Sequence, residues 1–145
     1  MRVLSGLMQY IAASCQQLNQ FYKLNKDKAR AKPQDLMYVA INSNGETCAA
    51  LRLLEYDTFL FLRSVLTTEK HRGQGVANNL IRYALQQHPS TIYTLPTPLA
   101  ISLYQRLGFV TVAKAEIPQP LLTLYRRFRQ GNDGTRVMVI NSVVG

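Results

Sequence analysis

The sequence is poor in the residues that build metal centres and disulfide frameworks. Its 145 residues include two cysteines, two histidines and no tryptophan. Cys15, Cys48, His71 and His88 show no metal-ligand spacing, so no metal site is expected. Two isolated cysteines are typical of free thiols in a reducing compartment, and we therefore expect a cytoplasmic protein.

Long apolar runs and internal divisions are also missing. No apolar run approaches the roughly 18 residues that a membrane-spanning helix needs, and no signal peptide is visible. No repeat, low-complexity tract or Pro/Gly/Ser-rich linker interrupts the chain. A length of 145 residues suits one domain with its own core, so residues 1–145 are expected to form a single domain.

Acidic residues are scarce, and the chain carries a formal net charge of +9 with 17 lysines and arginines against eight acidic residues. The basic residues gather between Lys23 and Lys32 and again at Arg126, Arg127 and Arg129. Such a surface attracts phosphate-bearing ligands and equally suits nucleic acid, so charge alone leaves the partner open.

Apolar periodicity predicts the elements of the first half. Spacings of three and four predict a helix over residues 5–22, followed by a basic loop or a frayed helix. Residues 36–41, 47–54 and 58–67 are rich in branched and aromatic side chains and predict an antiparallel meander of strands. A helix over 74–87 then crosses over to the next strand, which implies a parallel pair.

The second half completes the predicted sheet. After a strand over residues 91–95, Thr97 is predicted to cap a helix whose buried stripe is Leu99, Leu103 and Leu107 and whose end is Gly108. The remaining elements are expected to be a strand over 109–113, a helix around 121–128 and a strand over 136–144. The expected fold class is α/β, a mixed sheet of six or seven strands with helices on both faces.

The run Arg-Gly-Gln-Gly-Val-Ala from Arg72 to Ala77 lies between a predicted strand and a predicted helix. A glycine turn at a helix start presents unpaired N–H groups and the positive end of the helix dipole, which together favour phosphate. Glycines also remove the side chains that would keep a diphosphate from the main chain. The predicted cofactor-binding residues are Arg72, Gly73, Gln74, Gly75, Val76 and Ala77.

Two other phosphate-binding loops do not fit this run. A P-loop requires Gly-Lys-Ser/Thr after a glycine and four residues, and the sequence contains none. A dinucleotide-binding loop requires a third glycine where Asn78 stands, and an acidic residue further on that is missing around Leu95.

The run resembles the pyrophosphate loop of the GNAT acetyltransferase superfamily, Gln/Arg-x-x-Gly-x-Gly/Ala, with Arg72, Gly75 and Ala77 in its defined positions. Further on, Ala100 to Phe109 is similar to the superfamily segment Ala-x-x-Leu-Tyr-x-x-x-Gly-Phe. The two segments occur in the order seen in that superfamily. The resemblance implies a GNAT-like domain that binds acetyl-CoA and transfers its acetyl group to an amine.

The resemblance also implies roles for four further residues. The main chain of Val65, Leu66 and Thr67 would bind the pantetheine amides, and one of its N–H groups would polarise the thioester carbonyl. The phenol of Tyr104 would reach the thioester sulfur and protonate the leaving thiolate. A plain central strand at 65–67 and simple packing of Tyr104 remain the alternatives.

The residue that takes the proton of the amine is left open. The glutamates considered are Glu46, Glu55, Glu69 and Glu116, and none is favoured. His71 is expected to hydrogen-bond phosphate or solvent. The sequence also departs from the superfamily, because Pro96-Thr97-Pro98 stands where an asparagine often helps to hold the cofactor.

The predicted function is acetyl transfer to a primary amine of a small molecule or peptide. Two alternatives remain: a non-catalytic acyl-CoA-binding module and, suggested by the basic and aromatic residues 125–129, a nucleic-acid-binding domain. The resemblance implies that the basic segments 23–32 and 126–129 lie near the acceptor site. Their positive charge would suit a carboxylate-bearing acceptor, such as an amino acid, better than a polyamine. No membrane partner is expected, and a homodimer that pairs through the C-terminal strands is compatible with the fold.

Overall fold

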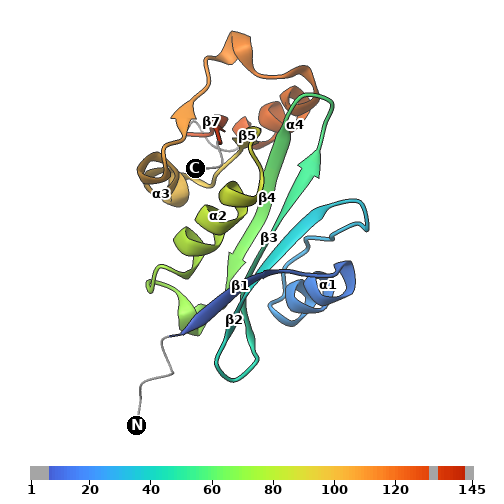
Figure 1. Ribbon diagram of the computed structural model, residues 1–145. Coiled ribbons are helices and arrows are strands. Elements are labelled where there is room, and N and C mark those ends of the chain that lie inside the picture. Colours follow the sequence, from blue (N-terminus) through green and yellow to red (C-terminus); the bar gives the residue numbers. More distant parts are fainter. Residues whose placement is uncertain (1–6, 131–133, 143–145) are drawn as a thin grey trace.

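A computed structural model describes residues 7–130 and 134–142, which form one seven-stranded sheet in the order β1-β2-β3-β4-β5-β7-β6 (Figure 1). The only parallel neighbours in this sheet are β4 and β5. The strands are β1 (Met8–Ala12), β2 (Leu36–Asn42), β3 (Thr47–Glu55), β4 (Leu60–Thr67), β5 (Thr91–Thr94), β6 (Val110–Thr111) and β7 (Met138–Asn141). The predicted mixed sheet, its meander and its parallel crossover are therefore confirmed.

Helices cover both faces of the sheet (Figure 1). They are α1 (Cys15–Leu24), α2 (Val76–Gln87), α3 (Ile101–Leu107) and α4 (Gln119–Arg129), with 3-10 turns η2 (Glu69–His71), η3 (Pro98–Ala100) and η4 (Lys114–Glu116). Within the described part of the chain, no helix has the length and apolarity to span a membrane.

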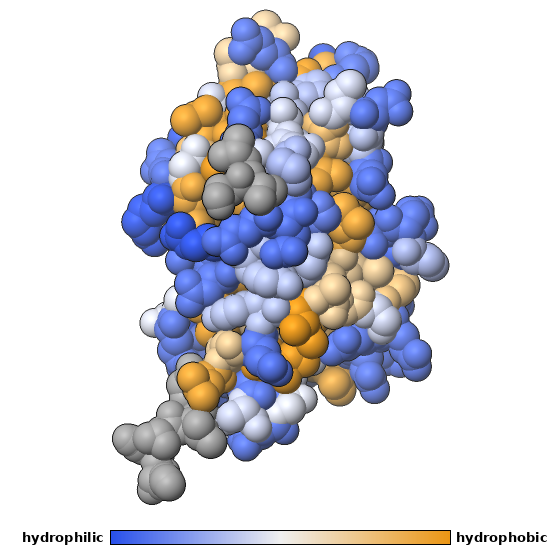
Figure 2. Space-filling view, viewed as in Figure 1, coloured by the Kyte–Doolittle hydropathy of each residue, from blue (hydrophilic) through white to orange (hydrophobic). Residues whose placement is uncertain are grey.

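Alternating residues of β3 separate the two faces. Leu51 and Leu53 pack in the core beneath α2 and α3, whereas Ala50 packs against α1 and Leu54 against α4. The exposed sides of α2 and α3 carry hydrophilic residues, as Figure 2 shows for the face on which they lie. Consequently α1 and α4 share one face, and the segment of sheet between them is where the candidate site begins.

The predicted helix over residues 5–22 is wrong in its first half. Residues 8–12 form the edge strand β1, which pairs with β2 from Met8↔Asn42 to Ala12↔Tyr38, and residues 5 and 6 lie outside the described residues. Ser14 then caps α1, because its hydroxyl accepts a hydrogen bond from the Gln17 N–H at 3.1 Å. Pairing with a distant strand overrides the local helical spacing, and the predicted basic loop occupies residues 25–35.

The buried stripe predicted for α3 is also partly wrong. Leu99 is 96% exposed, while Tyr104 is only 4% exposed. The reason is that Pro98–Ala100 form a 3-10 turn, so the α-helix begins at Ile101 and Leu99 falls off its inner face. Thr97 precedes this turn without a side-chain capping bond, whereas Gly108 ends α3 at φ +105° as predicted.

The last predicted strand is shorter than expected. It runs from Met138 to Asn141, and residues 143 and 144 lie outside the described residues.

Candidate functional site

Strands β4 and β5 separate partway along their length. Their pairing runs from Leu60↔Ile92 to Leu62↔Thr94 and then stops, although β4 continues to Thr67. Pro96 lies two residues after the end of β5, and proline cannot donate to a strand ladder. The backbone of residues 63–67 therefore has no strand partner on the β5 side within the described part of the sheet.

A bulge in β4 lies at the point of separation. Ser64 adopts φ +60°, and the register of β3 and β4 shifts between Ala50 and Arg52, so that Ser64 and Val65 together face Leu51. A left-handed conformation costs a residue with a Cβ about 1 kcal/mol, so neighbouring contacts must hold Ser64 in place.

Two side chains hold the bulge. Tyr22 of α1 donates a hydrogen bond of 2.7 Å to the Ser64 carbonyl, and Arg52 Nε donates one of 3.1 Å to Ser64 Oγ. Arg52 is itself fixed by Asp35, because its Nη1 lies 3.0 Å from Asp35 Oδ2. Each such bond contributes about 1 kcal/mol or more, which is enough to offset the strain at Ser64.

The turn at residues 72–75 follows β4 and η2. Gly73 and Gly75 have φ +77° and +79°, and Gly75 directly precedes α2. Within the described residues, the backbone N–H groups of 73–77 donate no hydrogen bond to protein, and residues 72–75 are exposed. A Cβ added at either glycine would meet nothing within 4 Å. The glycines thus supply a left-handed turn with free amides and open space above it, an arrangement that fits a diphosphate.

Arg72 turns back towards β4. Its Nε donates a hydrogen bond of 3.1 Å to the Thr67 carbonyl, and its other guanidinium nitrogens have no partner in the described residues. That carbonyl keeps a second lone pair for another donor.

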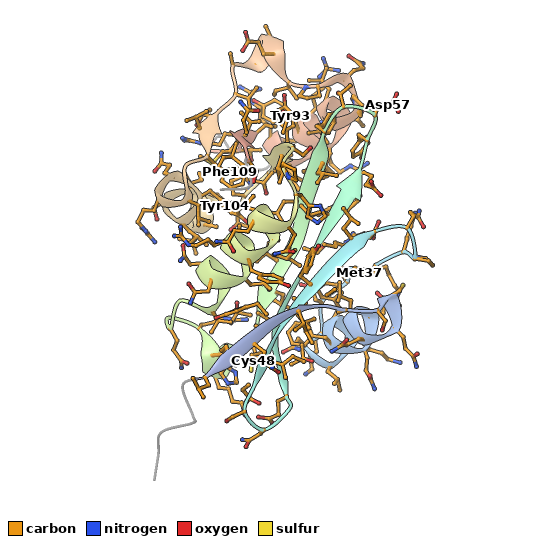
Figure 3. All side chains as sticks on the ribbon, in the orientation of Figure 1. Met37, Cys48, Asp57, Tyr93, Tyr104 and Phe109 are labelled. Carbon is orange, nitrogen blue, oxygen red and sulfur yellow. The ribbon has the colours of Figure 1, made fainter. Side chains whose placement is uncertain are left out.

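The expectation that His71 hydrogen-bonds phosphate or solvent is not met. Its Nδ1 lies 2.6 Å from Thr68 Oγ1 and its Nε2 lies 3.5 Å from Cys48 Sγ, so both ring nitrogens face protein. Burial raises the pKa of the Cys48 thiol, so this pair is not an activated nucleophile. Figure 3 shows Cys48 well away from Tyr104.

A cleft of about 870 Å³ opens where β4 and β5 separate. Its walls come from β4, from the segment after β5, from η3 and α3, from α4 and from the loop after α1. Of the residues predicted from the sequence, those that line it are Val65, Leu66, Thr67, Arg72, Ala77 and Tyr104. Four predicted residues, Gly73, Gln74, Gly75 and Val76, are not among those that line it. The two ends of the turn, Arg72 and Ala77, therefore share one cleft with β4 and the predicted phenol.

Tyr104 stands in the wall of this cleft on α3, where its ring packs edge-on against Phe109 at 5.2 Å (Figure 3). Burial raises the pKa of Tyr104 to about 12, against a smaller opposing effect of the Thr94 hydroxyl. Thr94 donates its own hydrogen to the Leu62 carbonyl at 3.1 Å, which caps the end of the parallel ladder. The phenol is thus held as a neutral hydrogen-bond donor.

The glutamates weighed from the sequence, Glu46, Glu55, Glu69 and Glu116, do not line the cleft. Of the described residues that do, Asp27 is the one carboxylate. It lies in the loop after α1, where its backbone N–H bonds the Tyr22 carbonyl at 2.9 Å and its Oδ1 accepts from the Ala29 N–H at 2.8 Å.

Sequence reasoning missed Asp27 together with the network of Tyr22, Asp35, Arg52 and Ser64. The available signal was Arg52, a charged residue between Leu51 and Leu53 in an otherwise apolar strand. A buried charge requires a partner, but nothing in the sequence identified Asp35, which lies 17 residues away.

Comparisons with known proteins agree with this geometry. A family model described as "Acetyltransferase (GNAT) domain" matches residues 33–111, which is more than half of the 145 residues. That segment contains the bulge, the glycine turn and Tyr104. No curated protein sequence matched the chain.

Solved structures of similar fold include two N-acetyltransferases and an N-acetylglutamate synthase. The ribosomal-protein-S18-alanine N-acetyltransferase of Escherichia coli has TM-score 0.67 and 15% identity, with 96% of each chain covered. Mutant forms of the spermidine/spermine N-acetyltransferase of Vibrio cholerae have TM-score 0.63 and 16% identity, covering 92% of this chain and 94% of that one. The N-acetylglutamate synthase of Neisseria gonorrhoeae, complexed with coenzyme A and L-arginine, has TM-score 0.67 and 11% identity, covering 92% of this chain and 33% of that one.

Proposed function

Because this chain belongs to the GNAT acetyltransferase family, its co-substrate is acetyl-CoA, and we propose that it transfers the acetyl group by direct attack of a primary amine on the thioester. The acceptor is then a small molecule or a peptide with such an amine. The observation that carries this proposal is the single cleft lined by both Tyr104, a buried phenol, and the two ends of the turn from Arg72 to Ala77, whose backbone amides from residue 73 onward have no protein acceptor within the described residues.

In this proposal the turn from Arg72 to Ala77 holds the diphosphate of the cofactor. Its support is the row of N–H groups without protein partners, the two left-handed glycines and the positive end of α2. Arg72 adds a guanidinium whose remaining nitrogens are free to bind a phosphate oxygen.

The main chain of Val65, Leu66 and Thr67 would bind the pantetheine arm as an added strand. Its support is the stretch of β4 beyond Leu62, which has lost β5 as a neighbour. A backbone N–H directed into the cleft would stabilise negative charge on the thioester oxygen, as an oxyanion hole does.

Tyr104 would donate its hydrogen to the departing sulfur. A phenol with a pKa of about 12 gives up its proton to a thiolate less readily than an ordinary tyrosine does. We therefore assign to Tyr104 a hydrogen bond that strengthens as charge develops on the sulfur, with full proton transfer completed by solvent.

Asp27 would receive the proton of the attacking amine, directly or through a water molecule. An ammonium must lose a proton before it can attack, and Asp27 is the one described carboxylate that lines the cleft. This role replaces the glutamates considered from the sequence.

The proposal is tested by release of free CoA thiol from acetyl-CoA in the presence of a panel of amines. Binding of acetyl-CoA to the native state alone also raises the melting temperature by mass action. Asp27→Asn is expected to lower the rate of thiol release about a hundredfold and to keep the acetyl-CoA-dependent rise in melting temperature. The exposed hairpin residue Asp57 supplies the control, Asp57→Asn, which changes neither. A rise in melting temperature without thiol release for any amine contradicts the proposed transfer.

A further inference from the structure

Arg63 occupies a distinctive position in β4. It follows Leu62, the last residue that pairs with β5, and it stands directly opposite Arg52 of β3. Like charges directly opposite each other on neighbouring strands repel and destabilise the sheet. Both arginines lie on the face that α1 and α4 share, where the cleft is open between these helices.

The two arginines differ in their partners. Arg52 has the buried carboxylate of Asp35 at 3.0 Å. Arg63 makes no ion pair and no side-chain hydrogen bond within the described residues, and its guanidinium carbon lies over the Phe61 ring, 5.9 Å from the ring centroid. Burial lowers the pKa of Arg63, and the charges of Arg52 and then of Arg127 on α4 lower it further.

A cation without an ion-pair partner in a partly desolvated place costs free energy, and the contact with the Phe61 ring recovers only part of it. Arg63 does line the cleft, as do the apolar side chains of Phe61, Leu124 and Phe128 and the carboxylate of Asp27. Its counter-charge is therefore expected on a ligand that enters the cleft from the face of α1 and α4. In the proposed function the glycine turn would hold the phosphates of acetyl-CoA, away from Arg63, so the ligand with this charge would be the acceptor.

We propose that the acceptor carries a carboxylate, which Arg63 binds while its amine faces Asp27. This inference rests on the proposed function and assigns the acceptor class for the same cleft: an amino-acid-like molecule with an apolar side chain. A guanidinium binds a carboxylate in a two-pronged geometry that a neutral amide cannot reproduce. A polyamine would instead bring positive charge to Arg63 and its neighbours Arg52 and Arg127.

The test compares acceptors that differ only in the carboxylate. L-phenylalanine, L-leucine, their amides and spermidine are offered to the wild-type chain with acetyl-CoA, and kcat/KM is measured by thiol release. We expect each acid to exceed its amide about tenfold or more, the range of a charge-assisted hydrogen bond, and spermidine to be the poorest acceptor. A difference in amine basicity cannot produce this result. A free carboxylate makes the neighbouring amine more basic than it is in the amide, so a smaller fraction of the acid has the neutral amine that attacks.

Two variants of Arg63 test whether this residue causes the preference for acids over amides, and a variant of Arg126 is the control. Arg63→Gln is expected to bring the ratio of acid to amide to about one, and Arg63→Lys to keep part of it. Because Arg63→Gln relieves the repulsion with Arg52, it should fold at least as stably as the wild type, which a purely structural role of Arg63 would not allow. Arg126→Gln removes the same charge from the exposed side of α4, outside the cleft, and should keep the full ratio.

The outcomes separate this inference from the function on which it rests. Equal use of acids and amides by the wild type, or an unchanged ratio in Arg63→Gln, overturns the carboxylate assignment. No turnover of any acid, while acetyl-CoA still raises the melting temperature, also overturns it and leaves cofactor binding standing. No effect of acetyl-CoA on the melting temperature overturns the proposed function itself.

Discussion

Tyr22 on α1 donates its phenolic hydrogen to the backbone carbonyl of Ser64 in β4 across 2.7 Å. This bond joins the helix that carries the Asp27 loop to the bulge at which β4 and β5 separate. It therefore couples the proposed acceptor end of the cleft to the strand that would hold the cofactor.

Tyr22→Phe should lower both stability and cofactor affinity. The change leaves a partly buried carbonyl without its donor, which costs about 1 kcal/mol in the free energy of unfolding. It also frees a strained residue next to Val65, so the affinity for acetyl-CoA should fall. Urea denaturation and calorimetric titration measure the two effects. Tyr10, whose hydroxyl makes no hydrogen bond within the described residues, supplies the control Tyr10→Phe. Equal stability of both variants would show that the bond does not hold the bulge.

Asp35→Asn should be strongly destabilising. It removes the one carboxylate paired with buried Arg52 and leaves Arg52 facing Arg63 without compensation. Breaking one partner of a buried pair typically costs about 3 kcal/mol or more. The free energy of unfolding from urea denaturation tests this value, with the exposed Asp57→Asn as the matched change. If Asp35→Asn lowers the free energy of unfolding no more than Asp57→Asn does, the ion pair of Asp35 with Arg52 does not stabilise the fold.

Tyr104→Phe should lower kcat about a hundredfold and leave the KM for acetyl-CoA nearly unchanged, because its hydroxyl is assigned to the departing sulfur rather than to binding. Tyr93→Phe is the control, since Tyr93 packs against Phe59 and does not line the cleft. Steady-state kinetics of the two variants measure these effects. An unchanged kcat in Tyr104→Phe would show that Tyr104 only packs in the core.

Tyr104 also predicts an alkaline limit to stability. Its pKa in the folded chain is about 12, above the ordinary value of 10, so the native state keeps a proton that the unfolded state loses. Its contribution to stability is full below pH 10 and is lost as the pH rises towards 12. Melting temperatures of the wild type and Tyr104→Phe between these pH values should converge, and parallel curves would contradict the assignment.

His88 predicts the opposite dependence at acid pH. Its Nε2 lies 2.7 Å from the Tyr38 hydroxyl, and burial lowers its pKa below 6.5, so the folded chain disfavours the charged imidazole. Its contribution is present above pH 6.5 and is lost as the pH falls through the lower folded value. His88→Gln should flatten the decline of melting temperature between neutral and acid pH, whereas an unaltered decline would assign it to other groups.

The sequence predicted best those features that depend on residues close together in the chain. The glycine turn between a strand and a helix and the left-handed end of α3 at Gly108 depend on residues close together in the chain, so both could be placed from the sequence alone. The positive φ of Gly73 and Gly75 was seen only in the structure. Pairing between distant segments could not be placed. Residues 8–12 have helical spacing and form a strand because β2 offers them a partner.

The same distinction applies to the candidate site. The glycine turn and Tyr104 belong to short segments whose spacing is visible in the sequence. Asp27, Arg63 and Asp35 take their places from the packing of α1 and α4 on one face of the sheet, which depends on contacts far apart in the chain. A charged residue in an apolar strand, such as Arg52, indicates that a partner is needed, but the sequence does not identify that partner.

The most direct test of the account is calorimetric titration of acetyl-CoA into the wild type, Gly75→Leu and Gly45→Leu. The two glycines have nearly the same conformation, φ +79° and +80°, and an added Cβ at either meets nothing within 4 Å, so the backbone strain of the two variants is matched. If the amides around Gly75 hold the diphosphate, Gly75→Leu weakens binding by at least about tenfold, or about 1.4 kcal/mol, and Gly45→Leu leaves it unchanged. Wild-type affinity in Gly75→Leu would contradict the account.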